Sequence, residues 1–449
     1  MSRREQKIQL SGRRKGVEAM NKKMKAISIG MVMVLLTLMS AACAKKESGG
    51  GAEAGGKNVK LDFVWFADGN EGAIMKDIIK DYEAKNTNVK VNMIEVPYKD
   101  LSTKLKTMIA GGEPPALARI STTELGGFAK QAVDLSESNG GLEKYTGQFI
   151  DSLKPFYVVN NKAVAAPMDV TANGLIYNKT LFDKAGVKVP SSPDNVWTWD
   201  EFSAALKQVM EKGGAKYGLV WDFTPQRWST ILYQFGGSLM SPDGAKATIN
   251  NEAGIQAVEY FKKLHTDGIA PTSVWLGGEN PNNLFRSGTV AAHLAGNWMI
   301  SNYKDISNFE WGVTYMPKAK QRSSVPGGKF AMAFKNSGVE KEATDFINYI
   351  TTKEVNAKYT QEALFLSPRK DNAKLDYAFG KEMMEVFSNE LNNTVPAAAE
   401  DWSKQTIVPK FSNELKKTIS EIIVGKITGQ AGLDKVAGLI DKAIGEEKK

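Results

Sequence analysis

Cysteine is almost absent from this sequence. Cys43 is the only one among 449 residues, so the chain cannot form an internal disulfide. It stands directly after a run of small residues near the N-terminus, which excludes a Cys/His nucleophile in the body of the chain. We therefore expect neither a disulfide framework nor thiol catalysis.

Histidine is also scarce. His265 and His293 are the only two, and neither has the spacing that zinc ligands show. No Gly-x-Ser-x-Gly elbow occurs. A near P-loop, Gly51-x4-Gly56-Lys57, lacks both the following Ser/Thr and a preceding strand. We expect no metal, no cofactor and no catalytic residue, although carboxylate pairs for glycoside hydrolysis need only meet in space, so spacing alone does not exclude them.

The body of the chain has little net charge. The formal charge is +8, but residues 1–42 hold nine Lys/Arg against Glu5 and Glu18, which leaves 8 − 7 = +1 for the rest. Phosphate contacts supply most non-specific affinity for nucleic acids. A nearly neutral body therefore argues against a nucleic-acid partner.

No apolar run is long enough to span a bilayer. The longest candidate, Ile27–Met39, has 13 residues, whereas a spanning helix needs about 20. It follows a cationic front and precedes Ser40–Ala42, which is the form of a secretory signal over 1–42; a structural helix is the alternative. Ala44–Lys57 has five glycines in fourteen residues and is predicted to be a flexible tether.

The first part of the body alternates strands with helices. Val59–Phe66, Val89–Val96 and Leu117–Ser121 have strand patterns, and helical patterns separate them around Ile74–Tyr82 and Leu101–Ile109. This order predicts an open, largely parallel α/β sheet with its ligand at the carboxyl ends of the strands.

The central segment, 160–202, predicts a crossing between two sheets. Apolar runs flank Asp169–Asn173, and a short helix over Thr180–Ala185 should stop at Gly186. Thr198 stands three residues before Glu201, which is the spacing of a capping box.

The same segment carries a resemblance. Its pattern is Pro-x-Asp, then Leu-Ile-Tyr-Asn-Lys-x-Leu-Phe-x-Lys-Ala-Gly, then Trp-Thr-Trp-Asp-Glu-Phe. This resembles the bacterial extracellular solute-binding proteins of the sugar-binding type, the receptors of ABC sugar importers related to the maltodextrin-binding protein. The resemblance extends over 58–449. It implies a two-lobe, type II periplasmic-binding-protein-like fold with lobes 58–168 plus 331–371 and 169–330 plus 372–449, joined by a hinge that closes on the ligand.

The resemblance also concerns Cys43, which lies where the family's lipoproteins are acylated, although Ser40 replaces the usual Leu. We expect residues 43–57 to tether a monomeric protein to the extracellular face of the cell membrane, in a Gram-positive cell. The implied partners are the transmembrane subunits of an ABC permease with a cytoplasmic ATPase.

A sugar offers an apolar ring face and a rim of hydroxyls, so its site needs aromatic and polar side chains. Trp65, Trp228 and Trp298 are the aromatic candidates, each with core packing as the alternative. Gly296-x-Trp298 resembles the family motif whose aromatic ring stacks on sugar.

The polar candidates lie in loops and at the predicted crossing, where a solvated residue or a helix cap is the alternative for each. They are Asn70, Glu71, Thr122, Glu124, Asp169, Thr171, Asp222 and Gln226. Gly327 and Gly328 could let backbone N–H groups approach the ligand. Arg369 is either a ligand contact or a structural ion-pair partner.

Together these features predict a substrate-binding lipoprotein that captures an oligosaccharide or related carbohydrate by hinge closure. A secreted carbohydrate-active enzyme would instead turn the sugar over. The same fold with a non-sugar solute is the third possibility, and it would need a charged or metal-ligating pocket.

Overall fold

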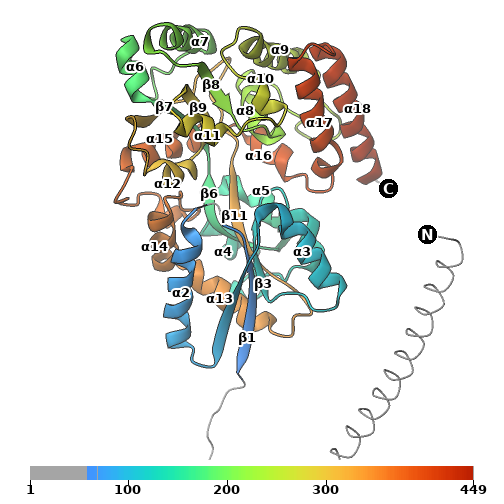
Figure 1. Cartoon of the computed structure of the whole chain (residues 1–449). Helices are drawn as coiled ribbons and strands as arrows, with labels where there is room; N and C mark the ends of the chain where they lie inside the picture. Colours follow the sequence, from blue (N-terminus) through green and yellow to red (C-terminus); the bar gives the residue numbers. More distant parts are fainter. Residues whose placement is uncertain (1–57, 68, 448–449) are drawn as a thin grey trace, which may run out of the picture. The chain divides into compact units, whose positions relative to one another are not determined.

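The computed structural model describes residues 58–67 and 69–447, so the expected signal segment, Cys43 and the tether lie outside it. The described residues belong to one compact unit that contains two large sheets. Figure 1 shows these sheets as separate parts bridged by two long strands. We call the five-stranded sheet with its helices the first lobe and the four-stranded sheet with its helices the second lobe.

The five-stranded sheet combines parallel and antiparallel pairs. Its spatial order is β2 (Val89–Glu95), β1 (Val59–Trp65), β3 (Leu117–Ser121), β11 (Gly327–Ala333) and β6 (Ala166–Thr171). β1 runs parallel to both β2 and β3, as expected. β11 is antiparallel to β3 and β6. It enters the sheet from the second lobe and runs against both neighbours, so the sheet is mixed. The other four strands share one direction, and the parallel pairing expected for the first three strands is confirmed.

The helices of the first lobe are amphipathic. They are α2 (Glu71–Lys85), α3 (Tyr98–Ala110), α4 (Leu142–Gly147), α5 (Lys154–Tyr157), α13 (Glu340–Ile350) and α14 (Lys353–Ala363), beside a short ladder of β4 (Val158–Val159) and β5 (Lys162–Ala163). In α2 the expected apolar face, Ile74, Ile78, Ile79 and Tyr82, is buried. Burial of such a face, rather than helix propensity, supplies most of the stability of a helix of this length.

The four-stranded sheet has the order β10 (Trp311–Thr314), β7 (Asn173–Asn178), β9 (Val290–Gly296) and β8 (Tyr217–Trp221). Its lobe contains α6 (Lys179–Ala185), α7 (Trp199–Gln208), α8 (Pro225–Gln234), α9 (Glu252–Thr266), α10 (Thr272–Trp275), α11 (Pro281–Arg286), α12 (Met299–Tyr303), α15 (Lys381–Asn392), α16 (Pro396–Ser403), α17 (Val408–Ile423) and α18 (Gly429–Glu447). β9 is buried throughout and lies between β7 and β8 at the centre of this sheet.

Two local predictions in the second lobe are confirmed. Gly186 ends α6 in the left-handed conformation, with φ +68°. Thr198 and Glu201 form the capping box of α7: the Glu201 N–H donates to Thr198 Oγ1 at 3.2 Å, and the Thr198 N–H donates to Glu201 Oε2 at 2.7 Å. Both features depend only on nearby residues, which is why the sequence predicts them well.

The first crossing between the sheets lies within the expected segment, Asp169–Asn173. β6 stays in the first sheet through Thr171, and β7 begins the second sheet at Asn173, so the chain changes sheets at Ala172, a few residues after the expected lobe boundary at 168/169. β11 already belongs to the first sheet from Gly327, whereas we expected the return at 331. The backbones of Gly327 and Gly328 pair with β6 as strand residues.

Candidate ligand-binding site

A buried ionic cluster lies at the carboxyl edge of the first sheet. Arg119, in the middle of β3, places Nη1 3.1 Å from Glu71 Oε1 and Nη2 3.7 Å from Asp169 Oδ2. All three residues are fully buried. The carboxyl ends of parallel strands are where ligands bind in such sheets. The structure thus brings Glu71 and Asp169 together, and the residue that joins them was missed because an arginine within a short apolar strand gives no motif.

Two aromatic rings cover the Arg119 guanidinium. Its central carbon lies 4.8 Å from the centre of the Trp65 ring and 4.5 Å from that of Phe66. Trp65 is fully buried and meets Phe63 edge to face at 5.2 Å. In this structure Trp65 therefore packs in the core, which is the alternative that the sequence left open, and the cation–π contact helps to hold Arg119 in place.

Tyr98 is an exposed ring at the same edge, and it is not among the predicted site residues. It opens α3 and is 46% exposed. Its ring centre lies 5.0 Å from that of Phe66, and its hydroxyl is 3.1 Å from Ser121 Oγ and 3.2 Å from Thr123 Oγ1. Phe66 directly follows β1, and Ser121 is the last residue of β3. The ring of Tyr98 therefore lies over the carboxyl ends of these two strands.

The strand pair β6–β11 holds four of the predicted residues. Thr171 pairs with Gly327 and Asp169 with Lys329, and the Lys329 N–H donates to Asp169 Oδ1 at 3.2 Å. A Cβ on Gly328 would lie 2.4 Å from the Asp169 carbonyl oxygen.

The glycines therefore permit close strand pairing, and the approach of their N–H groups to a ligand stays a prediction. Gly328 also accepts a hydrogen bond from the N–H of Thr122, at 3.2 Å. That bond places Thr122, another predicted residue, beside the strand pair.

Trp298 lies in the second lobe, directly after β9. It is partly buried and immediately precedes α12. A Cβ on Gly296 would come within 1.5 Å of the Trp298 ring, which explains the Gly-x-Trp spacing because the ring folds back over the glycine. The Arg227 guanidinium carbon lies 4.3 Å and Lys329 Nζ 5.6 Å from the ring centre.

Two buried amides lie near the first crossing. The N–H of Ala172 donates to Asn297 Oδ1 at 3.0 Å, which orients the Asn297 side chain. Asn297 Nδ2 and Gln226 Nε2 are buried and have no hydrogen-bond partner among the described residues. Buried donors without a partner are costly, so both are good candidates to donate to a ligand. Asn297 was missed because it stands between the two residues of the Gly-x-Trp motif.

The remaining predicted residues divide into two groups. Asn70 accepts from Ser301 Oγ at 3.0 Å, which joins the first loop to α12 of the second lobe. Glu124 is partly buried; burial raises the pKa of its carboxyl group to about 7. These two lie at the lobe junction or the strand edge, and contact with a ligand remains a prediction for both.

Three other candidates have structural partners. Trp228 is fully buried in the second lobe, so in this structure it is a core residue. Asp222 Oδ1 lies 3.6 Å from His293 Nε2. Arg369 pairs with Asp371 at 2.8 Å and donates from Nη1 to the Thr351 carbonyl at 2.7 Å, so the structural ion pair is the alternative that the structure shows.

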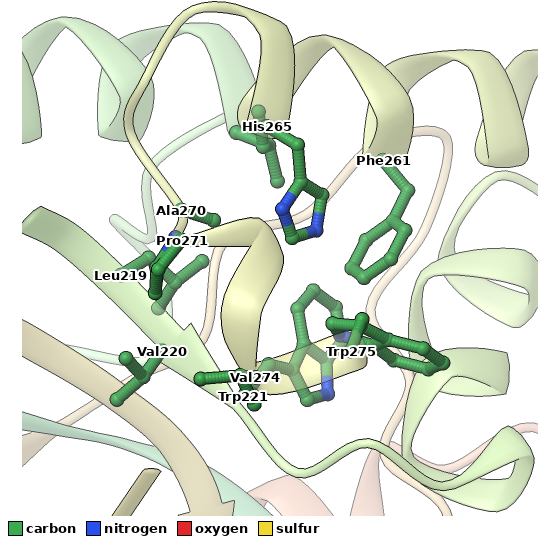
Figure 2. Close-up of a pocket in the computed structure, with 10 residues that line it drawn as sticks. Leu219, Val220, Trp221, Phe261, His265, Ala270, Pro271, Val274 and Trp275 are labelled. Atoms are coloured by element: carbon green, nitrogen blue, oxygen red, sulfur yellow. The ribbon is translucent and has the colours of Figure 1, made fainter. Parts of the chain in front are cut away.

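One enclosed cavity lies inside the second lobe, away from these residues. Figure 2 shows His265 and Phe261 of α9 facing Trp221 and Trp275 across it. Its volume is about 10 Å³, room for about one water molecule, so it cannot admit a sugar ring. Among the described residues no group of three or more His, Cys, Asp or Glu side chains could hold a metal ion, and no helix is long and apolar enough to cross a membrane.

The sequence between 67 and 357 matches the model of the bacterial extracellular solute-binding protein family. This match covers well over half of the chain. The chain belongs to this family. The resemblance found in the sequence is therefore confirmed, and the members of the family are binding proteins rather than enzymes.

Named relatives of this solute-binding protein bind sugars. The chain is 26% identical over 362 residues to the multiple sugar-binding protein of Streptococcus mutans, covering 75% of this chain and 80% of that one. It is 24% identical over 351 residues to the arabinooligosaccharide-binding protein of Bacillus subtilis, covering 75% and 78%.

Solved structures confirm the two-lobe fold. An ABC substrate-binding protein from Listeria monocytogenes, in complex with cycloalternan, matches with a TM-score of 0.76 at 23% identity, covering 87% of this chain and 100% of that one. The GacH receptor of Streptomyces glaucescens matches with a TM-score of 0.74 at 23% identity, covering 87% and 99%.

Proposed function

We propose that this protein is the carbohydrate receptor of an ABC importer. It binds an oligosaccharide or a related carbohydrate at the junction of its lobes and delivers it unchanged to the transmembrane subunits of a permease. The observation that carries this proposal is the position of Trp298, a partly exposed ring that directly follows the buried amide of Asn297 and contacts Arg227, the residue after Gln226. Ring faces and amide donors together match the apolar face and the hydroxyl rim of a sugar.

The relatives support the class of ligand. The family is described as extracellular solute-binding proteins, and the relatives compared above are named for sugars or arabinooligosaccharides.

Closure of the lobes is the proposed route of capture. Three chain segments connect the lobes: Ala172, residues 323–326 before β11, and residues 373–380 before α15. Several short connections between two lobes form a hinge. The bond from Ser301 to Asn70, between α12 and the first loop, is a contact that such a closure makes.

We further propose that Cys43 carries the lipid that anchors the protein to the extracellular face of the membrane, with residues 44–57 as the tether. Two acyl chains on one residue suffice for stable anchoring. A Cys43→Ser variant should appear in the culture medium, whereas the parent protein should sediment with membranes. Equal membrane fractions of the two proteins would refute the anchor.

A thermal-shift screen tests the binding function. The full chain is mixed with maltotriose, isomaltotriose, cellotriose, xylotriose, arabinotriose and diacetylchitobiose, each beside its monosaccharide. A ligand that binds only the folded protein raises Tm, by an amount that increases with its concentration over Kd. At least one oligosaccharide should raise Tm. Chromatography of the same samples reveals turnover, which would favour the secreted enzyme, and amino acids, polyamines and short peptides serve as the non-sugar comparison.

A further inference from the structure

Gln405 is a side chain of the second lobe that reaches the first lobe. It lies between α16 and α17, and its Nε2 donates to the carbonyl oxygen of Phe156, in α5 of the first lobe, at 2.8 Å. Figure 1 shows α16 and α12, which carries Ser301, on opposite sides of the strands β6 and β11 that bridge the lobes. The bonds made by Gln405 and Ser301 therefore join the lobes on both sides of the crossing strands.

Gly126 provides the space that the Gln405 side chain occupies. It lies in the 3₁₀ helix Leu125–Gln131 of the first lobe. A Cβ on Gly126 would come within 1.8 Å of Gln405 Oε1 and within 2.0 Å of Gln405 Cβ. Rotation of a side chain does not move its own Cβ, so only a shift of one of the two backbones relieves the overlap. A Cβ on the neighbouring Gly127 would meet nothing within 4 Å, so the close approach is specific to position 126.

Gln405 moves together with the second lobe. The helix α16, which precedes it, is bound to α8 by two side chains. Trp402 Nε1 donates to Ser229 Oγ at 2.9 Å. The Tyr233 hydroxyl donates to Asp401 Oδ2 at 3.0 Å. Because Trp402 and Asp401 are both buried, a rotation of the second lobe carries Gln405 toward the first lobe or away from it.

The contact between Gln405 and the first lobe is narrow. A groove of about 620 Å³ lies beside it, lined among others by Pro155 and Lys404, the residues that precede the two partners. Phe156 belongs to the four-residue helix α5, and the last carbonyl groups of a helix have no partner within it, so water can replace Gln405 as the donor. Gln405 Oε1 is buried and has no hydrogen-bond partner among the described residues, which keeps the net stabilisation small. Such a contact can form and separate as the lobes move.

We propose that Gln405 is a positioning residue of the closed receptor: its side chain seats on the backbone of Gly126 and latches the second lobe to the first over the bound carbohydrate. This inference rests on the proposed function, because the latch serves closure around a ligand. The apparent affinity of a two-state receptor depends on the fraction of chains in the closed form. A latch that favours the closed form therefore strengthens binding and slows release of the carbohydrate.

A double-mutant cycle on the full chain tests the latch. The ligand is the oligosaccharide that gives the largest thermal shift in the panel above, and surface plasmon resonance gives the association and dissociation rate constants. Gly126→Ala should weaken binding by about tenfold or more, because its Cβ overlaps seated Gln405. In a Gln405→Gly background, which removes both overlapping atoms, Gly126→Ala should cost less than about twofold. Gly127→Ala is the matched control in the same 3₁₀ helix and should change neither rate constant.

Gln405→Glu separates the hydrogen bond from the fit. The carboxylate has nearly the shape of the amide but no N–H to donate to Phe156. The dissociation rate constant should rise about fivefold, the usual effect of one neutral hydrogen bond. The association rate constant should stay the same, because the ligand meets the open form before the latch seats. A residue that only supported the fold would lower the Tm of the unliganded protein and leave the dissociation rate constant unchanged.

Small-angle X-ray scattering measures closure itself. The saturated Gly126→Ala protein should have a larger radius of gyration than the saturated parent. Equal affinities in these two proteins overturn the inference while the proposed function stands, and so does an undiminished effect of Gly126→Ala in the Gln405→Gly background. If Gly126→Ala does not fold, Gln405→Glu decides, and an unchanged dissociation rate constant overturns the latch. If no carbohydrate of the panel binds the parent, the proposed function fails, and equal radii of the unliganded proteins overturn the latch separately.

Discussion

The Arg227 guanidinium lies over the indole ring of Trp298, with its central carbon 4.3 Å from the ring centre. Arg227 Nη1 donates to Asn173 Oδ1 at 2.7 Å, so the arginine is fixed to the first residue of β7. This contact orients the ring and occupies part of its surface. A sugar that stacks on Trp298 must therefore use the remaining surface or displace Arg227.

The first prediction concerns Trp298. In Trp298→Ala the affinity for the bound oligosaccharide should fall at least tenfold, about 1.4 kcal/mol, because one stacking aromatic is lost. Trp311→Ala is the matched control, since Trp311 is also a partly buried tryptophan of the second lobe. Calorimetry on both variants decides: unchanged affinity in Trp298→Ala, with an unchanged Tm, would remove Trp298 from the site.

Arg119 provides a prediction about stability. Arg119→Met leaves Glu71 and Asp169 buried without their shared cation, and removing one side of a buried ion pair costs about 3–5 kcal/mol. Arg286→Met removes an exposed ion pair with Asp305 and should cost no more than about 1 kcal/mol. Urea denaturation measures both. Similar losses in the two variants would mean that the buried cluster contributes no more than a surface pair.

Gly328 should be intolerant of a side chain for structural reasons. The Cβ of an alanine at this position would lie 2.4 Å from the Asp169 carbonyl oxygen, so Gly328→Ala must separate β11 from β6. Overpacking of this kind costs about 1–3 kcal/mol. Gly127→Ala meets nothing within 4 Å and should change the free energy of unfolding by less than about 0.5 kcal/mol. Equal Tm values for both variants would contradict this account of the strand pair.

His265 makes stability depend on pH. Burial lowers the pKa of His265 from 6.5 to about 4, so between these values the unfolded chain binds a proton that the folded chain does not. Above pH 6.5 the ring is neutral in both states and does not lower the free energy of unfolding. As pH falls from 6.5 to 4, protonation of the unfolded chain lowers the free energy of unfolding by about 3 kcal/mol in all.

The matched variant for this prediction is His265→Leu, which should lose less stability between pH 7 and pH 4.5 than the parent protein. Chemical denaturation at the two pH values provides the comparison. The leucine removes the titrating ring of the cavity in Figure 2 and leaves every other titratable group in place. The same pH dependence in both proteins would show that His265 does not contribute.

Local features of the fold could be predicted from the sequence. The capping box of Thr198 and Glu201, the stop at Gly186 and the apolar face of α2 depend on residues a few positions apart. The direction of β11 and the position of the crossing at Ala172 depend on pairing between segments more than a hundred residues apart. Nothing local distinguishes a glycine pair in a turn from one in a strand.

The site was predictable only in part, for the same reason. Trp298 could be found because its motif is local: the ring folds over Gly296 two residues before it. Tyr98 was not predicted because the contacts that hold its ring, with Phe66 and Ser121, join residues that are distant in sequence. Arg119 was missed because burial of a cation is understandable only once Glu71 and Asp169 are seen beside it.

The central claim is that this protein binds a carbohydrate reversibly and leaves it intact. Equilibrium titration of the full chain with the best oligosaccharide of the panel, followed by chromatography of the ligand recovered after denaturation, tests it most directly. We predict one ligand per chain and recovery of the same oligosaccharide at its original length. Shortened products, or no saturable binding by any carbohydrate of the panel, would contradict the claim.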